Sequence, residues 1–182
     1  MVVILSGIPG AGKTTVMQKA LEKKPLKFVT YGTVMFDLAR EKMGVEDRDA
    51  MRTLPVERQR QLQEMTADRV AEMGDVVVDT HCTIKTPAGY LPGFPYDILK
   101  RLRPRLVILV EASPQEIAAR RSKDQDVRQR DPDTVEEMEE HQMMNRMAAM
   151  TYATLVGATV KIIHNREGRL EEAADQIVQA LG

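Results

Sequence analysis

An eight-residue segment near the start of the chain has the composition of a phosphate-binding loop. Residues 7–14 fit the pattern G-x-x-x-x-G-K-[ST], after a short apolar run and before a helical pattern. Glycines let successive backbone N–H groups surround a phosphate, and the start of the next helix adds partial positive charge. We therefore expect a nucleoside triphosphate here, with Lys13 reaching its β- and γ-phosphates. The residues expected to contact this nucleotide are Gly7, Ile8, Pro9, Gly10, Ala11, Gly12, Lys13, Thr14 and Thr15.

An acidic residue ends another apolar run. Residues 76–78 are all valine and are followed by Asp79. Parallel sheets bind ligands at the carboxyl ends of their strands, where such an aspartate can hold Mg²⁺ through a water molecule. Apolar strands that end in Asp are common, but beside a phosphate loop this one gains weight. We expect Thr14, through its hydroxyl, and Asp79 to bind Mg²⁺.

Basic residues gather in the middle of the chain. Residues 100–130 hold nine Lys or Arg against four Asp or Glu, whereas residues 131–140 hold six acids and no base. In phosphoryl transfer, negative charge spreads over the transferred group, and arginines on a closing flap stabilise it while excluding water. A solvated charged loop is the alternative, and the acidic run is interpreted as a solvated helix start. The predicted catalytic residues are Lys13, Arg120, Arg121, Arg128 and Arg130.

The elements that must position these residues alternate in type along the chain. Short apolar runs at 2–5, 26–31, 76–78, 106–110 and 158–163 are separated by helical patterns at 13–24, 34–43, 56–73, 96–102, 114–122, 134–156 and 170–181. This alternation predicts an α/β fold, a doubly wound five-stranded parallel sheet with helices on both faces, in one domain. Residues 80–95 and 123–132 show no regular periodicity, so we expect a long functional loop and a flap.

Composition excludes several classes of function. A net charge of −1 over 182 residues argues against binding nucleic acid through an overall basic field, and no apolar run approaches membrane-spanning length. The lone Cys82 cannot form an internal disulfide, which predicts a cytoplasmic protein. Five methionines share a face of residues 134–156, for which core packing is the simpler interpretation and a subunit interface the alternative. They are Met138, Met143, Met144, Met147 and Met150.

A phosphate loop alone fits a GTPase switch, a motor-like ATPase or a small kinase. The segment after the last apolar run, residues 164–168, lacks the N-K-x-D element of guanine-binding switches. The arginines favour a kinase over a motor. A phosphate acceptor would need no general base, because the second pKa of a phosphate monoester is about 6. An alcohol acceptor would need one, and Asp37 is the candidate, although an exposed or capping role suits it better.

Several further segments resemble the archaeal type of adenylate kinase, in the same order along nearly the whole chain. They are YGTVMF at 31–36, VEDRDAMR at 45–52, DTHCTIKTP at 79–87, GYLPG at 89–93, EHQMMNR at 140–146 and GATVKII at 157–163. The resemblance implies the reaction ATP + AMP ⇌ 2 ADP with Mg²⁺, and often a trimer. It also implies a lobe that binds the nucleoside monophosphate, at about 32–73, and a short lid at about 121–132.

The AMP site is assigned from position and charge. The motifs T-G-D-x-L-R and D-G-F-P-R of bacterial and eukaryotic adenylate kinases have no direct counterpart here. Another nucleoside monophosphate kinase, or an ATP-binding assembly factor of the same fold, remains an alternative at this stage. The residues expected to bind AMP are Gly32, Thr33, Arg48, Arg52, His81 and Lys85.

Overall fold

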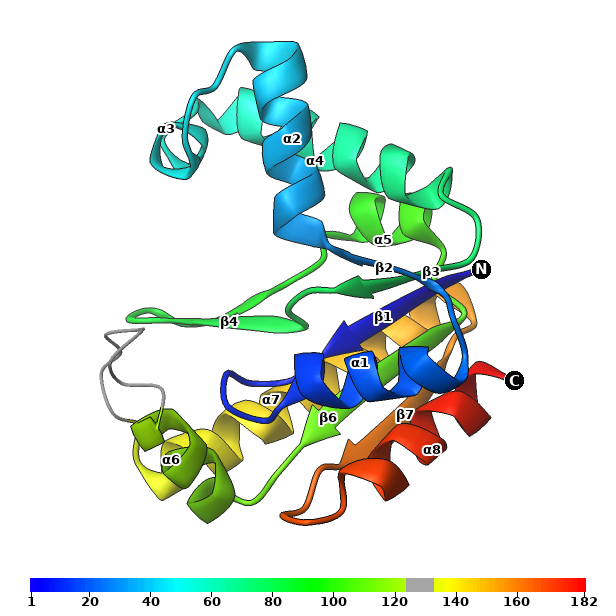
Figure 1. The fold of residues 1–182 in the computed structure, drawn as a ribbon. Helices are drawn as coiled ribbons and strands as arrows, with labels where there is room; N and C mark the ends of the chain where they lie inside the picture. Colours follow the sequence, from blue (N-terminus) through cyan, green and yellow to red (C-terminus); the bar gives the residue numbers. More distant parts are fainter. Residues whose placement is uncertain (124–132) are drawn as a thin grey trace.

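A parallel β-sheet forms the centre of the molecule (Figure 1). The structure is a computed structural model that describes residues 1–123 and 133–182, and within them the sheet has five strands in the order β2-β3-β1-β6-β7. All neighbouring strands are parallel, which confirms the predicted fold class. The strands are β1 (Val2–Ser6), β2 (Lys27–Thr30), β3 (Val76–Asp79), β6 (Leu106–Glu111) and β7 (Thr159–His164).

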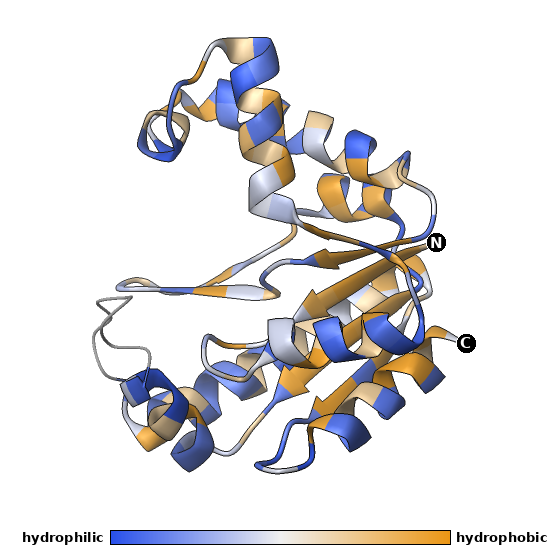
Figure 2. Cartoon of the chain, in the orientation of Figure 1, coloured by the Kyte–Doolittle hydropathy of each residue, from blue (hydrophilic) through white to orange (hydrophobic). Residues whose placement is uncertain are grey.

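Helices cover both faces of the sheet. Because successive side chains of a strand point to opposite sides, each strand contributes to two buried clusters. On β1, Val3 and Leu5 belong to one buried cluster and Val2 and Ile4 to another. The first cluster includes residues of α1 (Lys13–Lys23), α6 (Pro114–Lys123) and α8 (Leu170–Leu181). The second includes residues of α5 (Tyr96–Leu102) and, from α7 (Val135–Val156), Ala149 and Tyr152. Figure 2 shows the hydrophobic strands between helices whose outer faces are hydrophilic.

A helical lobe projects from the edge of the sheet that carries β2 (Figure 1). It comprises α2 (Tyr31–Met43), α3 (Arg48–Arg52) and α4 (Val56–Ala71). The lobe has a small hydrophobic cluster of its own, in which Leu62 of α4 packs with residues of α2 and α3. Helix α3 was not predicted, because five residues are too few for a helical period. Its start is stabilised by the Asp47 side chain, which accepts a hydrogen bond from the Ala50 N–H.

The segment 80–95, predicted to be irregular, contains a β-hairpin. Strand β4 (Thr83–Thr86) pairs antiparallel with β5 (Gly89–Pro92). Helix α7 holds the hairpin, because the Thr83 N–H and hydroxyl both donate to Asn145 Oδ1 and the Tyr152 hydroxyl donates to the Cys82 carbonyl. The chain passes so closely behind β4 that a Cβ on Gly93 would lie 1.8 Å from the His81 carbonyl oxygen. The prediction of a loop was therefore wrong for this segment.

The methionine face of α7 only partly belongs to the core. Met138 is buried, but Met143, Met147 and Met150 are 51%, 57% and 56% exposed. Core packing was therefore the wrong interpretation for these three side chains, and a subunit interface stays a prediction. The other predicted helices match observed ones within a few residues. Of the predicted flap, residues 124–132 lie outside the described part of the chain.

Among the described residues, no helix combines the length and the apolar composition that a bilayer crossing requires.

Candidate functional site

The phosphate loop connects β1 to α1 under tight steric restraint. Gly10 and Gly12 have φ angles of 92° and 85°, in the left-handed region that glycine adopts at little cost. A Cβ on Gly12 would lie only 2.3 Å from Asn165 Nδ2, so glycine is also required by space. No side-chain cap hydrogen bond occurs at the start of α1 within the described residues, so its first N–H groups are available to a ligand. The segment is thus shaped to surround an anion.

Lys13 and Asp79 face each other at the carboxyl end of the sheet. Leu5 of β1 is in register with Asp79 of β3, and Lys13 Nζ lies 3.5 Å from Asp79 Oδ1. Their side chains are only 13% and 17% exposed, so little water screens the pair. Asp79 thus holds the ammonium group beside the phosphate loop.

The carboxyl end of the sheet also suits a metal ion that takes most of its ligands from the phosphates of a nucleotide. No cluster of three or more His, Cys, Asp or Glu side chains able to cage a metal occurs within residues 1–123 and 133–182. Thr14 is exposed at the start of α1, which follows β1, and Asp79 ends β3, the strand paired with β1. One hydroxyl and one carboxylate fit Mg²⁺, which keeps several waters and takes its other ligands from substrate phosphates.

Two arginines of α6 bind backbone carbonyls of the phosphate loop. Arg120 donates from Nη1 to the Ala11 carbonyl (3.2 Å) and from Nη2 to the Asn165 carbonyl (2.9 Å). Arg121 donates from Nε to the Pro9 carbonyl at 2.9 Å. The buried Asn165 donates from Nδ2 to the Ala11 carbonyl, also at 2.9 Å. The Pro9 and Ala11 carbonyls are therefore held by side chains of other segments, which fixes the conformation of the loop.

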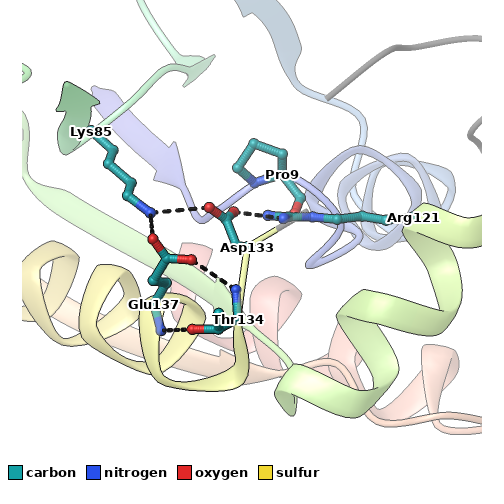
Figure 3. A network of polar contacts seen from close by, with 6 residues as sticks. All are labelled: Pro9, Lys85, Arg121, Asp133, Thr134 and Glu137. Carbon is teal, nitrogen blue, oxygen red and sulfur yellow. Dashed lines mark hydrogen bonds and ion pairs between the residues drawn. The ribbon is translucent and has the colours of Figure 1, made fainter. Parts of the chain in front are cut away.

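Arg121 continues into a network that reaches the hairpin (Figure 3). Its Nη1 lies 2.7 Å from Asp133 Oδ2, and Lys85 Nζ of β4 lies 3.1 Å from Asp133 Oδ1 and 2.8 Å from Glu137 Oε1. Burial alone would raise the pKa of the Asp133 carboxyl, but the hydrogen bonds from Arg121 and Lys85 outweigh it and hold that pKa below its usual value. Lys85 likewise lowers the pKa of Glu137. Both carboxylates are ionised at neutral pH.

A second group of predicted residues meets at the start of α2. Arg48 donates from Nη1 to the Gly32 carbonyl (3.3 Å) and from Nη2 to Thr33 Oγ1 (3.2 Å). Its guanidinium carbon lies 5.2 Å from the centre of the Phe36 ring, and that of Arg40 lies 5.8 Å from the same ring. Neither arginine has a carboxylate partner in the described part of the chain. Their positive charge is thus available to an anion.

Other predicted residues lie apart from these groups. Arg52 pairs with Asp49 at 3.2 Å and is 72% exposed, and the structure does not bring it to Arg48's partners. His81 is exposed and precedes the hairpin. Lys85 pairs with carboxylates rather than joining Arg48. Arg128 and Arg130 fall outside the described residues.

Similarity to known proteins shows which family this chain belongs to. Residues 6–139 match a family model described as an AAA domain. An adenylate kinase of Methanopyrus kandleri is 52% identical over 185 residues, covering 99% of this chain and 97% of that protein. An adenylate kinase of Methanocaldococcus jannaschii is 50% identical over 188 residues, covering 99% and 97%. The chain belongs to the adenylate kinase family. This confirms the resemblance found from the sequence.

Solved structures support the fold of this adenylate kinase. A shikimate kinase from Bacteroides thetaiotaomicron superposes with a TM-score of 0.61 at 17% identity, covering 100% of this chain and 98% of that one. At that identity the likeness concerns the fold alone, that of a P-loop kinase.

Sequence reasoning missed several polar residues of this adenylate kinase. The contact of Asn165 with the phosphate loop was not predicted, because one asparagine after a strand has no distinctive pattern. Asp133 and Glu137 were assigned to a solvated acidic run, whereas both bind cations of the site. The helix-capping pattern T-x-x-E at Thr134 and Glu137 could have indicated their place. It fixes the residue at which α7 begins, and therefore which of the acidic residues lie at the start of that helix.

Proposed function

We propose that this adenylate kinase transfers the γ-phosphoryl group of ATP reversibly to AMP between the phosphate loop and the start of α2. The observation that supports this most directly is strand order. Thr30, which precedes α2, is in register with Asp79, and Asp79 is in register with Leu5 before the phosphate loop. Two helix starts therefore leave strands that are two positions apart, about 10 Å at the usual strand spacing. A chain of phosphates fits between two such anion-binding ends.

On the donor side, residues 7–15 would hold the phosphates of ATP. Lys13 would leave Asp79 for the β- and γ-phosphates, and Thr14 and Asp79 would hold Mg²⁺, the latter through water. When bound, Mg²⁺ neutralises charge on the phosphates and orients them. Arg120 and Arg121 already bind the loop from α6, where their remaining N–H groups can stabilise the charge of the transferred group.

On the acceptor side, Arg48 and the first N–H groups of α2 would bind the AMP phosphate, beside Gly32 and Thr33. Arg48 makes two contacts at the start of α2, and its other guanidinium N–H groups remain available to phosphate oxygens. AMP brings its own nucleophile, since its phosphate is largely deprotonated at pH 7 with a second pKa of about 6. His81 and Lys85 would border the acceptor nucleoside from the hairpin. Arg52 would have to leave Asp49 to take part.

The remaining features of the proposal rest on family resemblance. Residues 32–73 would act as the lobe for the nucleoside monophosphate. Residues 121–132, with Arg128 and Arg130, would close over the phosphates as a short lid. A cytoplasmic trimer is the expected assembly, with the exposed methionine face of α7 as the candidate contact between subunits.

The acceptor assignment is tested by initial rates with AMP, CMP, UMP and GMP at one fixed ATP concentration. AMP should be preferred, and preference for a pyrimidine nucleotide would contradict the proposal. A bisubstrate dinucleotide, two adenosines joined through a phosphate chain, should compete with both ATP and AMP. Competition with ATP alone would mean that the acceptor is not bound between the phosphate loop and α2.

A further inference from the structure

One carboxylate joins residues from opposite sides of the site. Asp133 receives Arg121 of α6 on Oδ2 at 2.7 Å and Lys85 of the hairpin on Oδ1 at 3.1 Å (Figure 3). Arg121 in turn binds the phosphate loop through Pro9, whereas Lys85 stands on the hairpin that borders the proposed acceptor. Asp133 is therefore the point where the donor and hairpin sides meet.

The two acceptors of Arg121 fix the plane of its guanidinium group. Nε donates to the Pro9 carbonyl and Nη1 donates to Asp133. A planar group held at two of its nitrogens cannot rotate about either contact alone. In the described part of the chain, Nη2 has no acceptor, so the N–H groups on that nitrogen are available to a phosphate oxygen. The side chain is only 16% exposed, which favours a strong interaction there.

Lys85 is held in a comparable way. Two of its three N–H groups are directed at Asp133 and Glu137. Glu137 is itself rigid, because its other oxygen accepts the Thr134 N–H in a capping box at the start of α7. Asp133 directly precedes this capped helix start. The two carboxylates that hold Lys85 are thus mounted on a well-defined turn.

We propose that Asp133 is a positioning residue, which holds Arg121 of the phosphate-loop side and Lys85 of the hairpin in one fixed mutual orientation, so that Arg121 meets the transferred phosphate without rearrangement. Preorganised cations stabilise developing charge better than cations that must first be ordered. The inference rests on the catalytic role proposed above for Arg121. It concerns the transition state, so it predicts an effect on kcat rather than on the KM values.

The test compares Asp133→Asn with Glu136→Gln. Asn has the same shape but cannot attract both cations, whereas Glu136 lies in the same helix start, is exposed and belongs to no contact of the network. In Asp133→Asn we expect kcat to fall about 10-fold or more, as for the loss of a preorganised contact, with the KM values for ATP and AMP within about 3-fold. Glu136→Gln should leave kcat unchanged, and thermal melting should show both variants folded.

A double-mutant cycle with Arg121→Ala separates positioning from a direct effect. If Asp133 acts through Arg121, Asp133→Asn should lower kcat less than about 2-fold in the Arg121→Ala background. The inference would be overturned by a normal kcat in Asp133→Asn. It would also be overturned if Asp133→Asn lowered kcat as much in the Arg121→Ala background as in the wild-type background. Either result would leave the proposed role of Arg121 intact. An unchanged kcat in Arg121→Ala alone would overturn both.

Discussion

The donor and acceptor sides of the site are built with different rigidity. The phosphate loop lies on the main sheet, with Ile8 and Ala11 buried and its carbonyls bound by Arg120, Arg121 and Asn165. The acceptor side lies on a lobe with its own small cluster, where Arg48 is exposed and makes contacts of 3.2–3.3 Å. Segments with a separate core open more easily than segments that share the main one. The comparison suggests a preorganised donor site and an acceptor site completed by AMP.

The largest expected effect is on the donor side. Replacing Lys13 by Met should lower kcat by roughly three orders of magnitude or more, because the cation that stabilises the transferred phosphate is lost. Folding should persist, since Lys13 is partly exposed and, in the described part of the chain, forms an ion pair with Asp79 alone. Lys19→Met on the outer face of α1 is the matched control, and steady-state rates with circular dichroism provide the measurement. Near-normal activity in folded Lys13→Met would refute the donor assignment.

Removing Arg48 should affect the acceptor alone. For Arg48→Ala we expect the KM for AMP to rise about 10- to 100-fold, the value of one or two charge-assisted hydrogen bonds. The KM for ATP should change less than about 2-fold, because the phosphate loop shares no contact with Arg48. Arg52→Ala should have the smaller effect of the two, since Arg52 points to Asp49 and solvent. A larger rise in the KM for AMP in Arg52→Ala than in Arg48→Ala would mean that α3 reorients when AMP binds and brings Arg52 to the phosphate.

Cavities in the two cores should have different consequences. Leu62→Ala in the lobe and Ile108→Ala in the main sheet each remove a fully buried side chain, at a cost of about 2–5 kcal/mol in the free energy of unfolding. We expect Ile108→Ala to lower the melting temperature of the whole protein. Leu62→Ala should instead increase amide hydrogen exchange within residues 31–71 and raise the KM for AMP several-fold. Equal loss of protection throughout the chain in Leu62→Ala would show that the lobe is not a separate unit.

The smallest expected effect concerns Phe36. Its ring attracts the guanidinium groups of Arg40 and Arg48, an interaction worth about 0.5–1 kcal/mol at an exposed position. Phe36→Leu should therefore raise the KM for AMP about 2- to 5-fold, and Phe36→Tyr should restore it. If Tyr fails to do so in a folded variant, the ring acts by packing rather than by its attraction for cations.

Much of the fold follows from local patterns, whereas the site depends on contacts between distant segments. Valine-rich runs such as residues 76–78 are unambiguous, and the phosphate loop carries its own spacing. The hairpin was not predicted because β5 contains Gly and Pro, and because the segment is held by Asn145 and Tyr152, through contacts that span 62 and 70 residues. Charge alone could not separate Arg48 from Arg52, which stand one helical turn apart but find different partners. The exposed methionines of α7 were misassigned for a similar reason: helical periodicity shows which residues share a face, but not whether that face packs against the sheet or faces solvent.

Helix α7 supports the hairpin along much of its length. It has 22 residues, which corresponds to about 33 Å at 1.5 Å per residue. Glu137, Asn145 and Tyr152 are spaced by eight and seven residues, so they lie on one side of the helix, and each contacts the hairpin or the residue before it. A support at three heights prevents the hairpin from pivoting. The proposed acceptor site would thus have one wall on the rigid body of the molecule, and we expect AMP entry and release to require movement of the opposite wall.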